Sequence, residues 1–380
     1  MIEGPTSRTG QPRRALVLTG GGARGAYQVG VLKALAEWVE PDAPMPFRIV
    51  CGTSAGAIIG SILAANARHF PAGVATIERF WSHFRVGQVW RNDPLAVVGA
   101  AMRWVLAFLT GGLMARPPHS LFDNHPLRQT LESHVNFARV LQSLDRGDLD
   151  ALAITAAPYK GAPSRTYYMS HAAGVVGSGW SGGEPADLTL DHLMASAAVP
   201  FLFPAVRLPD GYYGDGAMRQ REPLAPAINL GADRVLVIGV RAAPGASTGP
   251  TMMEPSFGHI FGFMLDTLFT SNLHADIERL ERDNRLIEAA GSAAGGLRPV
   301  RALLIEPSQD PGDVAARHAQ RMPFAVRLLM RTLGAANRGG QLLLSYLLFD
   351  GAYARDLIAL GYADAVRNKE ALQSFLSSDE

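Results

Sequence analysis

The chain opens with two short apolar segments, each followed by a turn and then by an apolar helical pattern, and this repeat restricts the fold more than any other feature. The apolar segments are residues 15–18 and 47–51, and the helical patterns are residues 26–39 and 55–67. The first helical pattern is apolar on nearly all sides, which indicates burial against the face of a sheet. Strands that alternate with helices in this way predict a parallel sheet covered by helices on both faces.

Further strands and helices are expected along the rest of the chain. The expected strands are residues 151–155, 165–169, 206–208, 212–213, 234–240 and 300–305, and the expected helical segments are residues 71–143, 188–197 and 257–290. The triplet Pro209-Asp210-Gly211 favours a turn, so it is expected to close a hairpin. Residues 174–183 are rich in Gly and Ser and are expected to form a loop. We therefore predict the α/β fold class, with a mostly parallel central sheet.

The segment 242–256, which is rich in Ala, Pro, Gly, Ser and Thr, is the best candidate for a linker. It predicts three parts: a disordered tail at 1–12, an α/β domain at 13–243 and a mainly helical C-terminal extension at 244–380. The expected strand at 300–305 could return to the main sheet, which leaves the second boundary open.

The balance of charge and the cysteine content exclude several kinds of partner and site. The chain has 380 residues with 35 Lys and Arg against 34 Asp and Glu, so its net charge gives no argument for a nucleic-acid partner. Cys51 is the sole cysteine, which rules out an intramolecular disulfide and a cysteine-based zinc site. We expect neither a metal nor a cofactor.

The sequence also gives expectations about the membrane. The first residues include basic side chains but no apolar segment behind them, so no secretory signal is visible. The longest apolar stretch, residues 95–113, is interrupted by Arg103 and by three glycines, which argues against a membrane span. A cytoplasmic protein is therefore expected, with peripheral contact to a membrane as an open addition.

A glycine-rich turn, Gly20-Gly21-Gly22-Ala23-Arg24-Gly25, joins the first strand to the first helix. It allows three interpretations: a plain turn, a dinucleotide-binding fingerprint, or an oxyanion hole in which backbone N–H groups at a helix start face a developing negative charge. A dinucleotide site also needs an acidic residue at the end of the second strand, where this chain has Cys51-Gly52-Thr53-Ser54. The dinucleotide interpretation is therefore the weakest of the three.

The pattern Gly-x-Ser-x-Gly occurs three times, with Ser54, Ser181 and Ser247 at its centre. Ser181 and Ser247 lie in loops rich in Gly, Pro and Ser, with no apolar strand directly before them and no helical pattern directly after. Ser54 follows an apolar strand and precedes an apolar helix, which is the context of a nucleophile elbow. The plainer role for Ser54 is that of a helix N-cap, but its context favours a nucleophile.

A nucleophilic serine needs a base. None of the ten histidines lies in a recognisable acid–base motif, although the chain order Ser, Asp, His of α/β-hydrolases is possible by position. The alternative base is Asp215, in the segment Tyr213-Gly214-Asp215-Gly216-Ala217. Asp-Gly often marks a hairpin turn, but Asp210-Gly211 already supplies that turn, so Asp215 is expected after the strand, where active-site loops emerge.

These three motifs, in this order and spacing, resemble the patatin-like phospholipase family. The resemblance covers roughly residues 13–243, and the stretch Ala195 to Pro200 with Phe203-Pro204 is similar to the family's segment before the catalytic acid. It implies a patatin-like three-layer α/β/α fold and a lipid acyl hydrolase of the phospholipase A or lysophospholipase type. The chain is similar to bacterial members with a C-terminal extension of undefined role.

The resemblance also implies the site residues, with Ser54 and Asp215 as a catalytic dyad that uses no histidine. The other positions follow the motifs: Gly20, Gly21, Gly22, Ala23, Arg24 and Gly25 in the oxyanion-hole loop, Gly52, Thr53, Ala55 and Gly56 in the nucleophile elbow, and Gly216 and Ala217 in the acid motif. Arg24 either contacts a lipid phosphate or braces the loop, and the sequence leaves both roles open.

Asp215 would be an unusual base for a serine hydroxyl, because a free Asp has a pKa of about 3.9. The site is therefore expected to be largely dry, so that desolvation raises the pKa of the carboxylate. Two other function classes stay open: a soluble esterase, thioesterase or polyester-oligomer hydrolase with the same dyad, and a non-catalytic scaffold of the same fold. The sequence determines neither the lipid head group and chain length nor the oligomeric state.

Two features suggest contact with a lipid or acyl-ester substrate. Residues 97–109 and 257–269 are apolar and are candidates for the mouth of the site, although helical core is the commoner role of such segments. Arg327 and Arg331 lie four apart in an apolar stretch, as in a basic amphipathic helix on an anionic membrane. A solvated face of a helix is the alternative role of these two arginines.

Overall fold

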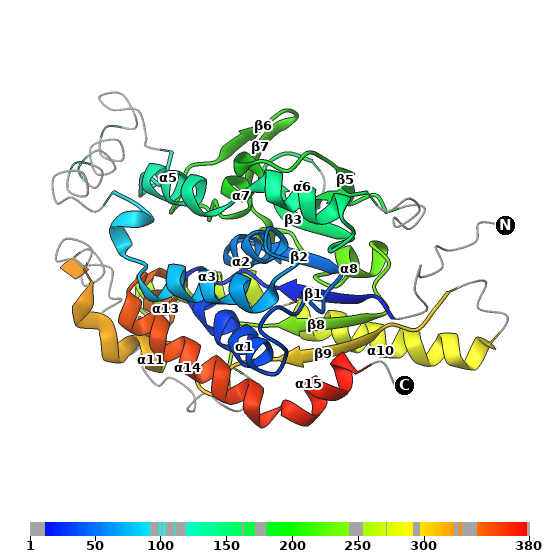
Figure 1. Cartoon of the computed structure of the whole chain (residues 1–380). Coiled ribbons are helices and arrows are strands. Elements are labelled where there is room, and N and C mark those ends of the chain that lie inside the picture. The colour runs from blue at the N-terminus through cyan, green and yellow to red at the C-terminus, as the bar shows by residue number, and fades with distance from the viewer. Residues whose placement is uncertain are drawn as a thin grey trace.

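A central β-sheet with helices on both faces forms the body of the protein in the computed structural model (Figure 1). The structure describes residues 12–91, 99, 102, 110, 119–161, 163–171, 180–242, 254–270, 272–291, 297–322, 327–328 and 340–377. Residues 1–11 of the predicted tail and residues 243–253 of the predicted linker lie outside these residues.

The sheet is mostly parallel, as predicted. Its strands are β1 (Arg14–Leu18), β2 (Ile49–Thr53), β3 (Ala151–Pro158), β4 (Arg165–Ser170), β5 (Gly183–Pro185), β6 (Val206–Leu208), β7 (Gly211–Asp215), β8 (Arg234–Ile238) and β9 (Arg301–Ile305). The strand order is β5-β4-β3-β2-β1-β8-β9, and the run from β3 to β9 is parallel throughout. The β6–β7 hairpin adds to this order through β7, which pairs antiparallel with β3.

Helices cover both faces of the sheet. They are α1 (Ala26–Glu37), α2 (Ala55–Ala64), α3 (Phe70–Ser82), α5 (His125–His134), α6 (Phe137–Asp145), α7 (Leu190–Ser196), α8 (Ala225–Asn229), α9 (Phe257–Thr270), α10 (Leu273–Ala290), α11 (Pro311–His318), α13 (Gln341–Leu347), α14 (Gly351–Arg367) and α15 (Lys369–Leu376). In Figure 1, α1, α2 and α3 lie in front of the sheet, and α8 and α10 lie behind it. This arrangement confirms the predicted α/β fold class.

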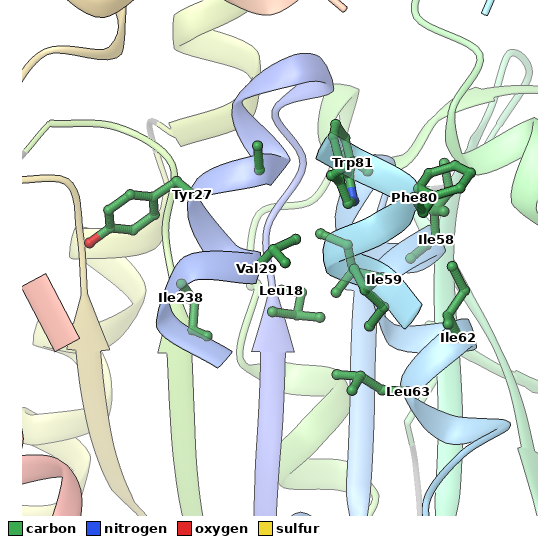
Figure 2. Close-up of a cluster of buried hydrophobic side chains, with 14 of the residues drawn as sticks. Leu18, Tyr27, Val29, Ile58, Ile59, Ile62, Leu63, Phe80, Trp81 and Ile238 are labelled. Carbon is green, nitrogen blue, oxygen red and sulfur yellow. The ribbon is translucent and has the colours of Figure 1, made fainter. Parts of the chain in front are cut away.

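The central strands β1, β2, β3 and β8 are mostly apolar because both of their faces are buried. In β1, Leu16 and Leu18 point into the core under α1 and α2, whereas Ala15 and Val17 point into the core under α8 and α10. Figure 2 shows the first core, with Leu18 and Ile238 on the strands and side chains of α1, α2 and α3 packed above them. The continuous apolar runs in the sequence therefore mark strands enclosed between two helical layers.

The C-terminal part of the chain shares the sheet of the N-terminal part. β9 pairs in parallel with β8, and α14 packs along α1. Tyr27 of α1 donates a hydrogen bond of 3.1 Å from its hydroxyl to Oδ2 of Asp364 in α14. The division of the chain at residue 243 stays a prediction, and the strand expected at 300–305 does return to the main sheet.

The helix expected over 257–290 is two helices, which corrects the sequence interpretation. Leu265 and Phe269 of α9 pack in the core on the α1 side, whereas Leu273 of α10 packs in the core on the α8 side. A single straight helix cannot pack against both faces of the sheet, so the helix ends where the chain passes from one face to the other.

The edge strand β5 corrects the prediction of a loop up to residue 183. Thr166 pairs with Gly183 and Tyr168 with Pro185, so β4 supplies the hydrogen-bond partners of a segment that has few apolar residues of its own. Within the described residues, none of the helices combines the length and the apolar character that crossing a bilayer requires.

Candidate active site

Ser54 occupies a strained turn between β2 and α2. Its backbone has φ 55° and ψ −124°, in the left-handed region that residues other than glycine seldom adopt. Ser54 precedes the first residue of α2, but its side chain forms no capping hydrogen bond with the helix. The plainer N-cap role is therefore absent, and the hydroxyl is left for another partner. The residue is 3% exposed.

Asp215 is the last residue of β7 rather than a residue in the loop after it, which corrects the sequence interpretation. β3 lies between the two strands that carry the candidate residues: Thr155 pairs with Thr53 of β2, and Ala156 pairs with Asp215 of β7. Because Thr155 and Ala156 are adjacent, this register places Ser54 and Asp215 at the same end of the sheet. The β6–β7 hairpin thus places Asp215 next to the turn that contains Ser54.

The carboxylate of Asp215 is fully enclosed and 1% exposed. Burial raises its pKa to about 7, and contacts with the Ser54 hydroxyl and the Ala217 N–H partly offset this rise. The Ala217 N–H donates to Oδ1 at 3.0 Å, whereas Oδ2 accepts no hydrogen bond of ordinary geometry from any described residue. The Ser54 hydroxyl is thus close to the carboxylate without a fully formed hydrogen bond, as is common in catalytic pairs without substrate.

The glycine-rich turn lies against Ser54. A Cβ at Gly20 would come within 2.6 Å of the Phe269 ring in α9, which is a clash, and within 3.2 Å of the Ser54 Cβ, which is a tight contact. Gly22 has φ 54°, which favours glycine. Within the described residues, the N–H groups of Gly21 and Gly22 donate no backbone hydrogen bond. The turn therefore offers free donors next to Ser54.

Arg24 is buried in this turn and faces the interior. Its Nε donates to Ser345 Oγ at 2.8 Å, and its Nη1 donates to Asp266 Oδ1 and to the Tyr346 hydroxyl, both at 3.0 Å. The guanidinium also lies 3.9 Å from the centre of the Tyr346 ring. With 1% of its surface exposed, Arg24 braces the turn against α9 and α13, which favours this role over contact with a lipid phosphate.

The remaining motif residues lie around this pair. Ala23 and Gly25 belong to the short 3-10 helix Gly22–Gly25, and Gly52 and Thr53 end β2. Thr53 donates through Oγ1 to Gln220 Oε1 at 2.8 Å. Ala55 and Gly56 begin α2, so their N–H groups are among the helix donors that have no intrahelical partner, and Gly216 and Ala217 begin the 3-10 helix Gly216–Met218.

Ser196 is a residue of the site to which sequence reasoning gave no role. Its Oγ accepts a hydrogen bond of 2.8 Å from the Ser54 N–H and donates one of 2.7 Å to the Thr155 carbonyl. Two residues later, the Ala198 carbonyl accepts a hydrogen bond of 2.9 Å from the Asp215 N–H. Resemblance had singled out Ala195 to Pro200, but no signal in the residues predicted these bonds.

Among the described residues, the structure does not bring the other candidates to the site. Ser181 is exposed and precedes the edge strand β5, and Ser247 lies outside the described residues. None of the hydrogen bonds among the described residues joins a histidine to Ser54 or Asp215. The described part of the chain also contains no group of three or more His, Cys, Asp or Glu side chains placed to hold a metal ion.

The regions suggested for lipid contact are described in part. Of residues 97–109, only 99 and 102 are described, and Met102 is 62% exposed. Arg331 lies outside the described residues, and Arg327 donates to the Gln320 carbonyl at 2.8 Å. The basic amphipathic helix therefore stays a prediction. Segment 257–269 is α9, with a mixed role: part of it is core and part is exposed.

The fold and the position of Ser54 define a three-layer α/β protein with a serine on a strained strand-to-helix turn. The family model described as patatin-like phospholipase matches residues 16–228, more than half of the chain. The chain belongs to the patatin-like phospholipase family, as the sequence motifs predict.

Curated relatives match over a short part of their length. Lysophospholipase nte1 of Aspergillus niger is 43% identical over 76 residues, which are 20% of this chain and 4% of that protein. Patatin-like phospholipase domain-containing protein 7 of Rattus norvegicus is 40% identical over 85 residues, which are 22% of this chain and 5% of that protein. The chain thus spans only a small fraction of the length of these relatives.

Among solved structures, human GIVD cytosolic phospholipase A2 is similar, with a TM-score of 0.47 and 11% identity over 98% of this chain and 60% of that chain. VipD from Legionella pneumophila has a TM-score of 0.38 and 16% identity over 90% of this chain and 70% of that chain. Family membership rests on the sequence match rather than on these two likenesses.

Proposed function

We propose that the protein is a serine lipid acyl hydrolase that cleaves carboxylic esters of lipids through a Ser54–Asp215 dyad. The observation that carries this proposal is the pairing of a serine on a strained turn with a buried carboxylate whose pKa is raised to about 7. A carboxylate of ordinary pKa would hold a serine proton too weakly to act as its base near neutral pH. Burial of Asp215 removes this difficulty.

In the proposed reaction, the Ser54 oxygen attacks the ester carbonyl while Oδ2 of Asp215 takes the hydroxyl proton. Oδ2 suits this role because Oδ1 is already held by the Ala217 N–H. Collapse of the tetrahedral intermediate releases the alcohol, with the proton returned from Asp215, and leaves an acyl group on Ser54. A water molecule then attacks the acyl-enzyme, again with Asp215 as base, and restores the serine.

The oxyanion would be stabilised by backbone N–H groups. Gly21 and Gly22 have free donors in the turn beside Ser54, and Ala55 supplies another at the start of α2. Donors that are fixed before the reaction need no reorganisation when charge develops on the carbonyl oxygen. The network around Arg24 supports this role because it holds the glycine turn in place.

A lipid as the substrate is supported by two considerations. The names of the curated relatives refer to a lysophospholipase and to a patatin-like phospholipase domain. In addition, α9 places Phe269 against Gly20 and exposes four large apolar side chains: Phe257, Ile260, Phe263 and Met264. An apolar surface on the helix that borders the site suits an enzyme that acts on lipid, including by peripheral contact with a membrane.

A panel of substrates on wild type and on Ser54→Ala tests the proposal. We expect the wild type to hydrolyse phospholipid or lysophospholipid in vesicles or micelles, and the variant to be inactive. Turnover of a short-chain nitrophenyl ester but of no lipid would favour the soluble esterase class instead. Absence of turnover with both kinds of substrate would favour a non-catalytic scaffold.

A further inference from the structure

The hydroxyl of Ser196 ties the nucleophile turn to the sheet. It accepts a hydrogen bond of 2.8 Å from the Ser54 N–H and donates one of 2.7 Å to the carbonyl of Thr155 in β3. Ser196 is the last residue of α7 and is 0% exposed, so its hydroxyl is shielded from bulk water. The hydroxyl therefore uses both its donor and its acceptor on backbone groups, which fixes its position.

The same segment also fixes the candidate base. The Ala198 carbonyl, two residues after Ser196, accepts the Asp215 N–H at 2.9 Å. Asp215 in turn pairs with Ala156, the neighbour of Thr155. Ser54 and Asp215 are therefore both bonded to one short stretch of chain, and the separation of their side chains depends on that stretch.

The hydrogen bond from the Ser54 N–H to Ser196 stabilises the strained backbone at Ser54. A serine with φ 55° tends to relax toward ordinary backbone angles unless its surroundings hold it. The Ser54 N–H cannot bond within α2, because it lies before the first helical residue, and Ser196 is the partner that holds it. Because this bond occupies the Ser54 N–H, other donors would have to stabilise the oxyanion.

We infer that Ser196 is a positioning residue, which holds the Ser54 turn so that the hydroxyl faces Asp215. This inference rests on the proposed function, because it gives Ser196 a role only if Ser54 is the nucleophile. Removing the hydroxyl would leave substrate binding intact and misplace the reacting oxygen. A shift of about 1 Å in a reacting group can reduce a rate by about 100-fold.

The experiment compares Ser196→Ala with wild type on a soluble nitrophenyl ester and on a fluorophosphonate, which labels an active serine. We expect kcat and the labelling rate to fall by about 10- to 100-fold, with KM changed less than about twofold. Ser61→Ala is the matched control, because Ser61 is also 0% exposed and, among the described residues, its hydroxyl has no hydrogen-bond partner. It should leave kcat and the labelling rate unchanged.

Ser196→Cys provides a second variant with nearly the same shape and a weaker donor and acceptor. If Ser196→Ala fails to fold, as judged by circular dichroism and Tm, Ser196→Cys takes its place. We expect Ser196→Cys to fold and to have a lower kcat than wild type. Wild-type kcat in a folded Ser196 variant, or an equal loss of kcat in Ser61→Ala, would overturn the inference. Full activity of Ser54→Ala would instead overturn the proposed function, so the two failures are distinguishable.

Discussion

Arg24 and Asp266 form a buried ion pair that joins the glycine turn after β1 to helix α9. Nη1 of Arg24 lies 3.0 Å from Oδ1 of Asp266, and the two side chains are 1% and 13% exposed. Tyr346 donates a further hydrogen bond of 2.9 Å from its hydroxyl to the same Oδ1. A turn proposed to hold an oxyanion is thus supported by side chains from the C-terminal part of the chain, far away in sequence.

Removing the acidic partner should destabilise the protein strongly. Asp266→Ala leaves the guanidinium of Arg24 buried without its carboxylate, and loss of one partner of a buried pair costs about 3–5 kcal/mol. The free energy of unfolding, measured by denaturant titration, should fall by that amount. The control is Glu78→Ala, which breaks the half-exposed pair with Lys33 and should cost less than about 1 kcal/mol. Equal effects of the two changes would contradict the structural role given to Arg24.

Ser54→Ala should reduce ester hydrolysis by at least about a thousandfold, because the attacking oxygen is lost. Ser181→Ala should have no effect, because Ser181 is exposed and precedes an edge strand. Ser247→Ala is expected to be neutral as well, from its sequence context. Mass spectrometry after fluorophosphonate treatment checks the assignment, and a label on Ser181 or Ser247 with Ser54 unlabelled would contradict it.

Asp215→Asn should lower kcat by about 10²- to 10⁴-fold, the usual contribution of general acid–base catalysis. Substitution of any single histidine by Ala or Gln should leave a substantial fraction of the activity, because no histidine bonds to Ser54 or Asp215 among the described residues. The measurement is kcat on a soluble ester for all ten histidine variants. A histidine variant that lowers kcat as much as Ser54→Ala does would contradict the dyad hypothesis.

The pH dependence should follow the raised pKa of Asp215. In wild type, kcat/KM should rise with pH through about 7, as the carboxyl loses its proton and becomes a base. Tyr159, whose own pKa is raised by burial and by Asp215, is the nearby titratable group, and it stays protonated in this range. A profile with its acidic limb near pH 4 would show that the base is not a buried carboxylate.

The same pKa has a consequence for stability. Between pH 3.8 and about 7, the folded protein keeps a proton on Asp215 that the unfolded chain has released, so stability is lost as the pH rises through this range. Asp215→Asn carries no charge and avoids that loss. At pH 8 the variant should therefore be more stable than wild type by up to about 4 kcal/mol, and the gain should vanish near pH 4. Denaturant titrations at both pH values measure it.

The exposed apolar face of α9 should contribute to binding of lipid vesicles. Phe257 and Phe263 are 62% and 63% exposed, and full burial of one such ring contributes about 1.5–3 kcal/mol, so partial insertion of both rings is expected to contribute about 2 kcal/mol. The double change Phe257→Ser and Phe263→Ser should weaken vesicle affinity by about thirtyfold, or about 2 kcal/mol, without affecting hydrolysis of a soluble ester. Leu286→Ser on α10, also 63% exposed, is the control and should bind vesicles like wild type in co-sedimentation. An equal loss of vesicle affinity in both variants would contradict a specific role of α9 in lipid binding.

Most of the secondary structure could be predicted because its signals are local. Residues 15–18 and 55–67 are apolar over the lengths of a strand and a helix, and the structure has β1 and α2 there. The β5 strand at 183–185 escaped prediction because its partner β4 supplies its pairing, and its own residues carry no apolar alternation. The break between α9 and α10 escaped prediction because it depends on which face of the sheet each helix covers.

By itself, the sequence determined the layered α/β fold and the place of Ser54, since an apolar strand, a glycine-flanked serine and an apolar helix are consecutive in the chain. Tertiary structure alone decided what surrounds that serine. The register of β3 brings Asp215 to it, the hydroxyl of Ser196 reaches its N–H from 142 residues away, and Arg24 turns inward to Asp266. Local patterns specify backbone conformation and burial, whereas contacts between distant residues depend on which strands pair and on how the helices pack, and the pattern of one segment does not specify these.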